Sequence, residues 1–248
     1  MSSSMPGTLT FRQGIRDGIP ICLGYLSVSF AFGVFATGYG LSVIEAVLLS
    51  LTNVTSAGQL AAVPIIASHG SFLELAASQF VINLRYMLMS TSLSQKMDNQ
   101  MGFLSRAAVG FAITDETFGV AVTKQERLTK SYMLGLELLP ILGWTAGTAL
   151  GAAAGYLLPS FIISALGIAI YAMFLAIIIP PAKKSRPVLF CVITAAALSC
   201  MFRFIPGLNR VSTGFVVIIV GILSALVFAL IFPVPDGSGD TTKEDTDA

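Results

Sequence analysis

Long apolar segments alternate with short polar ones along most of this chain. An apolar helix of about 20 residues spans the ~30 Å hydrocarbon core of a bilayer, and eight segments approach or exceed that length. The pattern therefore predicts an all-α integral membrane protein, a polytopic bundle of about eight transmembrane helices. The expected spans are residues 19–37, 41–67, 72–90, 107–123, 132–158, 161–181, 187–204 and 211–232.

The second expected span carries a polar patch in its middle, TNVTSAGQ at residues 52–59. As one straight helix, this span would be roughly 40 Å long, which exceeds the ~30 Å core. A break at the patch would expose backbone groups that can bind charged ligands at mid-membrane. Alternatively, the helix is continuous and its Ser and Thr hydroxyls bond to its own carbonyls. With a break, the expected pathway residues here are Asn53, Ser56, Gly58 and Gln59.

The third expected span carries a polar stripe. Gln79, Asn83, Tyr86 and Ser90 are 4, 3 and 4 residues apart, so they share one face of a helix. Arg85 lies beside that stripe. A charge inside a span costs ~2.5–3.5 kcal/mol, and it is usually paired or faces a wet cavity. We therefore expect Asn83 and Arg85 to line a path for a water-soluble substrate.

The fourth expected span contains two adjacent acids, Asp115 and Glu116, near its middle. Adjacent helical residues point about 100° apart, which predicts that the two do not both serve one narrow site. One could pair with Arg85 or Arg203, and the other could bind substrate or carry a proton. A Glu45–Arg85 pair is an alternative. The acidic centre also allows a re-entrant segment in place of a full crossing.

The fifth expected span has a face of small residues, because glycines recur at every fourth position, at Gly143, Gly147, Gly151 and Gly155. This spacing lets helix backbones approach closely, so the face is expected to pack against another span or another subunit. A weak internal similarity at an offset near 120 residues sets Pro20 and Tyr25 near Pro140 and Trp144. It predicts two internal repeats of parallel orientation.

Composition and charge agree with a membrane protein and predict its orientation. Hydrophobic residues make up 55% of the chain and charged residues 11%, against about 25% charged in soluble domains. Eight spans place both termini on one side. If that side is cytoplasmic, it holds most of the basic residues near span ends, as the positive-inside rule requires. Lys96 and Arg106 then fall on the other side, and Glu74 and Glu137 lie at hydrated cytoplasmic span ends.

The expected division of the chain has three parts. Residues 1–18 form a cytoplasmic segment, which contains a short interfacial helix over residues 8–18. Residues 19–232 form the transmembrane permease domain. Residues 233–248 hold five acids and one base, and they are expected to be a disordered acidic tail.

Patterns for other chemistries are absent from the sequence. It contains neither GxxxxGK[ST] nor GxSxG, so neither an ATP-driven pump nor a serine hydrolase is expected. Its three cysteines lie in apolar segments, and its single histidine, His69, cannot build a metal site alone. We therefore expect a protein that is not an enzyme, that uses no cofactor or metal and that has no nucleic-acid partner.

Several of these stretches resemble the AzlC-type branched-chain amino-acid exporter family, the large subunit of a two-component permease. The resemblance covers roughly residues 10–230, and one departure is Ser56, where the family pattern tends to have a glycine three residues before the glutamine. The stretches that carry it are Gly14…Asp17-Gly18-Ile19-Pro20…Gly24, Ser56-Ala57-Gly58-Gln59, Asn83-Leu84-Arg85-Tyr86 and Thr114-Asp115-Glu116-Thr117-Phe118.

The resemblance implies a secondary transporter of the bacterial inner membrane. It implies export of branched-chain amino acids, mainly leucine, isoleucine and valine, with methionine as a further candidate. It also implies a small multi-span partner subunit of the AzlD type. On that basis Arg85 would orient the substrate carboxylate or hold the ion pair that positions it. Asp115 or Glu116 would bind the ammonium group or carry a proton driven by the proton gradient. The alternatives are a permease or channel for another small solute and a membrane scaffold that transports nothing.

Overall fold

The computed structural model describes residues 8–99 and 101–233, and within them the chain forms helices and no β-strand. The expectation of an all-α membrane protein is therefore confirmed. Most of the expected acidic tail, residues 234–248, and residues 1–7 lie outside the described residues.

The first helix, α1 (Phe11–Gly38), is continuous. It begins at a capping box, in which the Thr10 hydroxyl accepts the Gln13 amide and the Gln13 side chain accepts the Thr10 amide. The expected interfacial helix over residues 8–18 is therefore the first part of α1 and not a separate element. Gly18 lies inside this helix, where a Cβ would come within 2.7 Å of the Leu136 carbonyl oxygen.

The α1 helix packs along α7 (Lys130–Gly155), and the two helices run parallel. A Cβ at Gly143 would lie 2.7 Å from the Cys22 carbonyl oxygen, and one at Gly151 would lie 2.7 Å from the Phe30 carbonyl carbon. Both pairs are 121 residues apart, so the contacts advance in register along the two helices. Close backbone approach of this kind requires glycine. Parallel packing at this offset is compatible with parallel repeats, which remain a prediction.

The second expected span is a helical hairpin. Its two arms are α2 (Val43–Thr52) and α3 (Ser56–Ala67), and residues 53–55 between them are not helical. Ser50 of α2 accepts a hydrogen bond from Gln59 of α3, and Ala46 and Val63 belong to one buried cluster. These antiparallel contacts return α3 to the end of α1 at which α2 begins. The helix break allowed by the sequence is present, but the chain turns back instead of crossing.

The fourth expected span is a second hairpin, formed by α5 (Phe103–Ala112) and α6 (Asp115–Thr123). Arg106 at its start donates to the Ser94 carbonyl of α4 (Phe72–Lys96), and Lys96 donates to the carbonyls of Val122 and Lys124 at its end. Both ends of the segment therefore lie at the end of α4, and the segment is re-entrant. Lys96 and Arg106 lie at the same end of the molecule as Lys124, which corrects the side expected for them.

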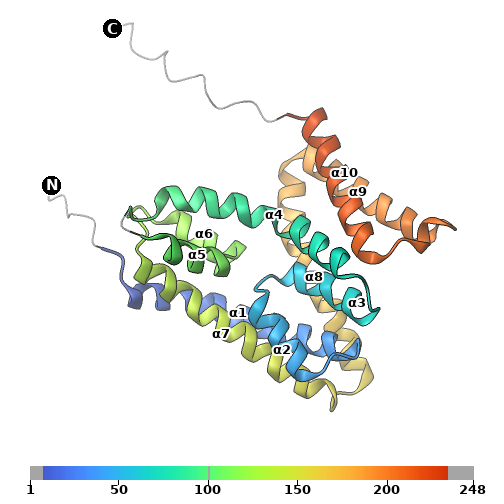
Figure 1. Cartoon of the computed structure of the whole chain (residues 1–248), viewed down its shortest axis with the longest axis horizontal. Helices are drawn as coiled ribbons and strands as arrows, with labels where there is room; N and C mark the ends of the chain where they lie inside the picture. Colours follow the sequence, from blue (N-terminus) through green and yellow to red (C-terminus); the bar gives the residue numbers. More distant parts are fainter. Residues whose placement is uncertain (1–7, 100, 234–248) are drawn as a thin grey trace, which may run out of the picture.

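The remaining helices are α8 (Ser160–Lys184), α9 (Arg186–Phe204) and α10 (Thr213–Ile231), with a short 3₁₀ turn at Leu208–Arg210. α8 contacts α1, α10 packs on α4 and α3, and α9 and α10 lie together at one side of the molecule (Figure 1). In the described part of the chain, five helices are long and apolar enough to cross a membrane, namely α1, α7, α8, α9 and α10.

Two acids expected at hydrated span ends are buried. Glu74 is 5% exposed, and it accepts hydrogen bonds from the Ser212 hydroxyl and from the Gly214 amide, the latter at 3.0 Å. Glu137 is 2% exposed, and neither of its carboxylate oxygens has a hydrogen-bond partner among the described residues. Neither position was predictable from hydropathy, because burial here comes from packing between helices distant in sequence.

Candidate functional site

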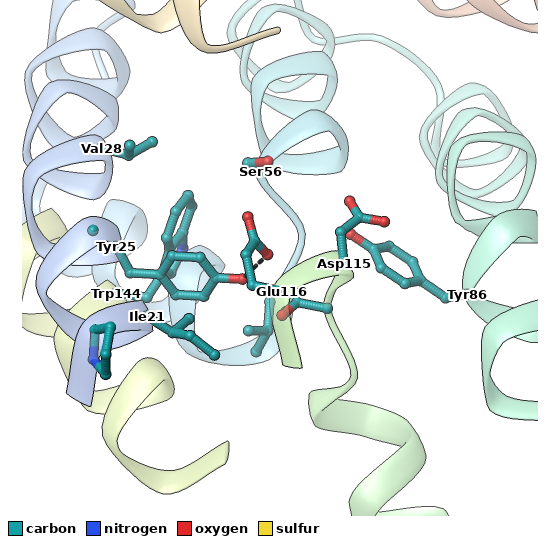
Figure 2. A pocket seen from close by; sticks show the side chains of 12 residues that line it. Ile21, Tyr25, Val28, Ser56, Tyr86, Asp115, Glu116 and Trp144 are labelled. Carbon is teal, nitrogen blue, oxygen red and sulfur yellow. Dashed lines mark hydrogen bonds between the residues drawn. The ribbon is translucent and has the colours of Figure 1, made fainter. Parts of the chain in front are cut away.

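The tips of the two hairpins meet at a cavity of about 370 Å³, which lies against α1 and α7. The α2–α3 tip contributes Val54 and Ser56, and the α5–α6 tip contributes Thr114, Asp115 and Glu116. Figure 2 shows Tyr25, Ile21 and Trp144 on one side and Tyr86 on the other, with both acids between them and facing Ser56. The complete lining is Pro20, Ile21, Gly24, Tyr25, Val28, Val54, Ser56, Tyr86, Thr114, Asp115, Glu116 and Trp144.

The acidic side of this cavity is the first turn of α6. Thr114 starts the helix, because its hydroxyl accepts the Thr117 amide and its own amide donates to the Thr117 hydroxyl. Acidic residues in a first turn are favoured by the partial positive charge at the helix N-terminus. Asp115 and Glu116 both line the cavity, which corrects the expectation that they cannot serve one site. They do so because the cavity lies beyond the end of a helix and not along one narrow face.

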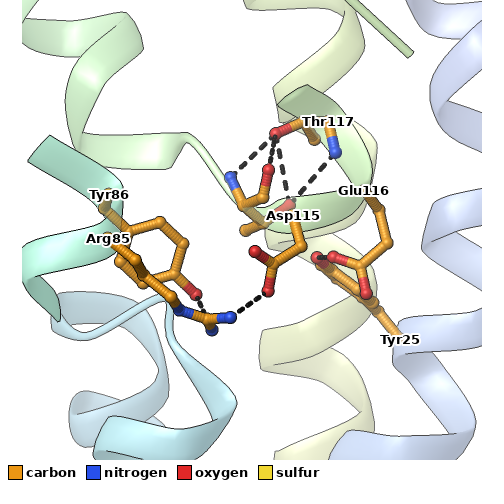
Figure 3. Close-up of polar contacts among 7 residues, drawn as sticks. Tyr25, Arg85, Tyr86, Asp115, Glu116 and Thr117 are labelled. Carbon is orange, nitrogen blue, oxygen red and sulfur yellow. Dashed lines mark hydrogen bonds and ion pairs between the residues drawn. The ribbon is translucent and has the colours of Figure 1, made fainter. Parts of the chain in front are cut away.

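Each acid has a defined partner (Figure 3). The Arg85 guanidinium pairs with the Asp115 carboxylate at 2.6 Å, with the two side chains 40% and 37% exposed. Arg85 also donates to the Tyr86 hydroxyl at 2.8 Å and lies over its ring. The Tyr25 hydroxyl donates to Glu116. The alternative Glu45–Arg85 pair is wrong, because Glu45 accepts from the amide and the hydroxyl of Ser42 at the start of α2.

The α3 helix presents its N-terminus to the same cavity. α3 begins at Ser56, which lines the cavity, and its N-cap residue Thr55 makes no side-chain hydrogen bond to the first turn. The first amides of a helix have no partner within the helix, and they carry its partial positive charge. The cavity therefore has a positive end at α3 and a negative side at α6.

A buried network holds the aromatic wall. The Trp144 ring meets the Tyr25 ring edge-on at 5.2 Å, and the Trp144 indole donates to the Gln59 amide oxygen at 2.8 Å. Gln59 in turn donates to Ser50 at 2.9 Å, and Ser50 contacts Thr148 at 2.7 Å. Gln59 is fully buried, so it lies behind the wall and does not line the cavity.

A second cavity of about 240 Å³ contains two more of the predicted residues, Asn53 and Asn83. It shares Val54 and Tyr86 with the first cavity. Gly58 lines neither, but its carbonyl accepts from Gln79 at 2.9 Å, and a Cβ at Gly58 would come within 2.5 Å of the same side chain. Some of the predicted residues therefore line one of two adjacent cavities, and the others, such as Gly58 and Gln59, make hydrogen bonds behind the cavity walls.

The packing glycines lie away from both cavities. Gly143, Gly147 and Gly151 face the backbone or side chains of α1, and Gly155 faces Thr37 at its far end. Tyr25, Thr114 and Trp144 were not among the predicted site residues. The internal similarity sets Tyr25 near Trp144, and one aromatic residue in each of two helices at this offset is the sequence signal that could pair them. In the described residues, no group of three or more His, Cys, Asp or Glu could hold a metal ion.

Comparison with known proteins places the site in a family. The AzlC protein family matches residues 20–158. The chain belongs to the AzlC family. The match includes every residue that lines the first cavity, from Pro20 to Trp144. The match ends before α8, so it covers most of α1, the two hairpins, α4 and α7.

Relatives of this AzlC family member extend over nearly the whole chain. An uncharacterized membrane protein of Archaeoglobus fulgidus is 32% identical over 86% of this chain and 92% of its own. The inner membrane protein YgaZ of Escherichia coli is 29% identical over 95% of this chain and 96% of its own. The branched-chain amino acid transport protein AzlC of Bacillus subtilis is 24% identical, covering 87% and 85%. No solved structure matches.

Proposed function

We propose that this protein is a secondary transporter that exports branched-chain amino acids, with the first cavity as its substrate site. The observation that carries the proposal is the meeting of two interrupted helices at a cavity that is charged on one side and apolar on the other. Interrupted helices at the membrane midplane are typical of substrate sites in secondary transporters. The name of the Bacillus subtilis relative supports amino acids as the substrate class.

The cavity offers a complement to each part of a zwitterion. A substrate carboxylate would accept from the first amides of α3 at Ser56, which carry no side-chain cap. The ammonium group would lie against Glu116, whose one described partner is the neutral Tyr25 hydroxyl. Asp115 is already paired with Arg85, and that ion pair would hold the acidic turn in place. Of the two roles expected for Arg85, this proposal uses the ion pair with Asp115 and gives the substrate carboxylate to α3.

The apolar wall fits a branched aliphatic side chain. The wall consists of Ile21 and Val28 of α1, Val54 of the α2–α3 tip and the Trp144 ring. The three aliphatic side chains have no hydrogen-bonding group, and the Trp144 indole already donates to Gln59. A volume of about 370 Å³ is within the ~300–1,000 Å³ typical of small-molecule sites. Leucine, isoleucine and valine, and also methionine, would bury their side chains here.

The rest of the proposal concerns energy, partner and orientation. We propose that the proton gradient drives export, with Asp115 or Glu116 as the proton carrier, and that a small multi-span AzlD-type subunit completes the transporter. We further propose a bacterial inner-membrane location with both termini cytoplasmic. The basic residues Lys96, Arg106 and Lys124 at one end of the molecule support that orientation.

Efflux of preloaded labelled leucine and valine from cells that express the chain with its small partner tests the proposal. We expect saturable efflux that an uncoupler abolishes. Glu116→Gln should raise the half-saturating leucine concentration by about tenfold or more, since a hydrogen bond to a charged group contributes ~1.5–3 kcal/mol. Glu45→Gln, which alters a carboxylate outside the cavity, is the matched control and should leave that value unchanged.

Two results would contradict the proposal. Absence of leucine and valine efflux from a correctly assembled pair would remove the substrate assignment. Flux that does not saturate and shows no counterflow would indicate a channel.

A further inference from the structure

The second cavity, of about 240 Å³, is built from the opposite ends of the same broken helices. The first arms of the two hairpins, α2 and α5, both end there: Thr52 and Asn53 close α2, and Phe111 and Ile113 close α5. The second arms, α3 and α6, begin at the first cavity. The second cavity therefore faces two helix C-termini, together with Thr55, the N-cap residue of α3.

Helix C-termini concentrate acceptors. The last carbonyls of a helix have no partner within it, and they carry a partial negative charge of about half an electron. Neither α2 nor α5 has a basic residue in its last turn, and no side chain with a formal charge lines the second cavity among the described residues. The Arg85 guanidinium donates to the Tyr86 hydroxyl of this cavity, but its charge is paired with Asp115.

The side chains of the second cavity also present oxygen. The Gln79 amide donates to the Gly58 carbonyl, so its own oxygen accepts from the Asn53 amide nitrogen at 3.0 Å. That bond uses the side-chain nitrogen of Asn53 as the donor and leaves its side-chain oxygen, Oδ1, as an acceptor. The Thr52 hydroxyl donates to the Leu48 carbonyl at 2.7 Å, which likewise leaves lone pairs. The Asn83 amide oxygen is buried and has no hydrogen-bond partner in the described residues.

We infer that the second cavity binds a small monovalent cation, either an alkali ion such as Na⁺ or an ammonium group. Neutral amide, hydroxyl and carbonyl oxygens at two helix C-termini suit such a cation, as in the cation sites of other broken-helix transporters. The lack of a carboxylate among the described lining residues disfavours Ca²⁺ and Mg²⁺, which are usually bound through carboxylates. Under the proposed function the ammonium group of the substrate lies at Glu116 in the first cavity. The second cavity therefore takes a different cation, and its assignment does not rest on the proposed function.

Thermal unfolding of the purified full-length chain in detergent tests the inference without any transport. Choline chloride is the reference salt, because choline is too large for a site that binds small cations. NaCl, KCl or methylammonium chloride then replaces it at constant ionic strength. We expect at least one of the three small cations to raise the unfolding midpoint by several degrees with a saturable dose dependence. Asn83→Leu should abolish that shift. Asn209→Leu, at an exposed position in the 3₁₀ turn, is the matched control and should retain it.

The probes separate the two sources of the cation. A shift with Na⁺ or K⁺ that Asn83→Leu removes assigns an alkali ion, and a shift with methylammonium alone assigns the ammonium group. Asn53→Asp adds a negative charge to the same cavity and should lower the half-saturating cation concentration, which provides a second variant if Asn83→Leu does not fold. Equal midpoints in all four salts would overturn the inference. Because no substrate is used, failure of leucine export would leave this result unaffected.

Discussion

At the scale of single residues, Tyr25 connects the apolar wall of the substrate cavity to its acidic turn. Its hydroxyl donates to Glu116, and its ring packs against Trp144. Tyr25→Phe removes the hydroxyl and keeps the ring. We expect about three- to tenfold weaker apparent leucine affinity, because a typical hydrogen bond contributes ~0.5–1.5 kcal/mol. The concentration dependence of leucine efflux measures it. Tyr39→Phe, at an exposed position outside the cavity, is the control, and equal affinity in both variants would contradict the role of the Tyr25 hydroxyl.

Gln59 acts at the same scale, but through another residue. Its amide oxygen accepts the Trp144 indole N–H, and Trp144 is the only tryptophan of the chain. In Gln59→Leu that N–H loses its partner, which costs about 1–3 kcal/mol of folding free energy. We expect a shifted Trp144 emission maximum and a lower unfolding midpoint. Gln95→Leu, at an exposed position of α4, should change neither. An unaltered emission spectrum in Gln59→Leu would show that Gln59 does not position the ring.

At the scale of elements, the parallel helices α1 and α7 form the side of the first cavity that faces both hairpin tips. A Cβ at Gly151 would come within 2.9 Å of the Phe30 Cα, which is closer than atoms pack. Gly151→Ala should therefore destabilise the protein by about 1–3 kcal/mol. Gly167→Ala, in α8 with nothing within 4 Å of the added Cβ, should be neutral or stabilising, since Ala favours helix. Unfolding midpoints in detergent compare the two, and equal midpoints would contradict close packing at Gly151.

At the scale of the whole molecule, Glu74 is one of the links between α10 and the rest of the fold. Its carboxylate accepts the Gly214 amide in the first turn of α10, so it serves as a cap supplied by another helix. Glu74→Ala leaves that amide without an acceptor. We expect its hydrogen exchange to accelerate by about tenfold or more, since a bond to a charged group contributes ~1.5–3 kcal/mol.

Mass-spectrometric exchange of the peptide that begins α10 measures this change. Glu74→Gln keeps an acceptor oxygen and should show an intermediate rate. Glu126→Ala, in the loop before α7, is the control and should exchange as the unaltered protein does. Unchanged exchange in Glu74→Ala would mean that packing alone holds α10 in place.

Part of the candidate site was readable from local sequence. The polar patch at residues 52–59 indicated a helix break, and the pairing of Arg85 with Asp115 was one of the alternatives that charge inside a membrane suggested. The break before Asp115 also had a local signal, because Thr114 and Thr117 form a capping box. The apolar residues on both sides of the two acids favour one continuous helix, so hydropathy allows a re-entrant segment here but does not require it.

The sequence by itself determined that this is an all-α membrane protein and where its apolar helices lie, because hydropathy and helix length act locally. It also determined that Gly143, Gly147 and Gly151 form one face. Only the tertiary structure decided that the chain turns back after each break, that both tips meet, and that Glu74 and Glu137 are buried. A break frees the direction of the following helix, and that direction is then decided by contacts such as Ser50–Gln59 and Lys96–Val122, between residues on different helices.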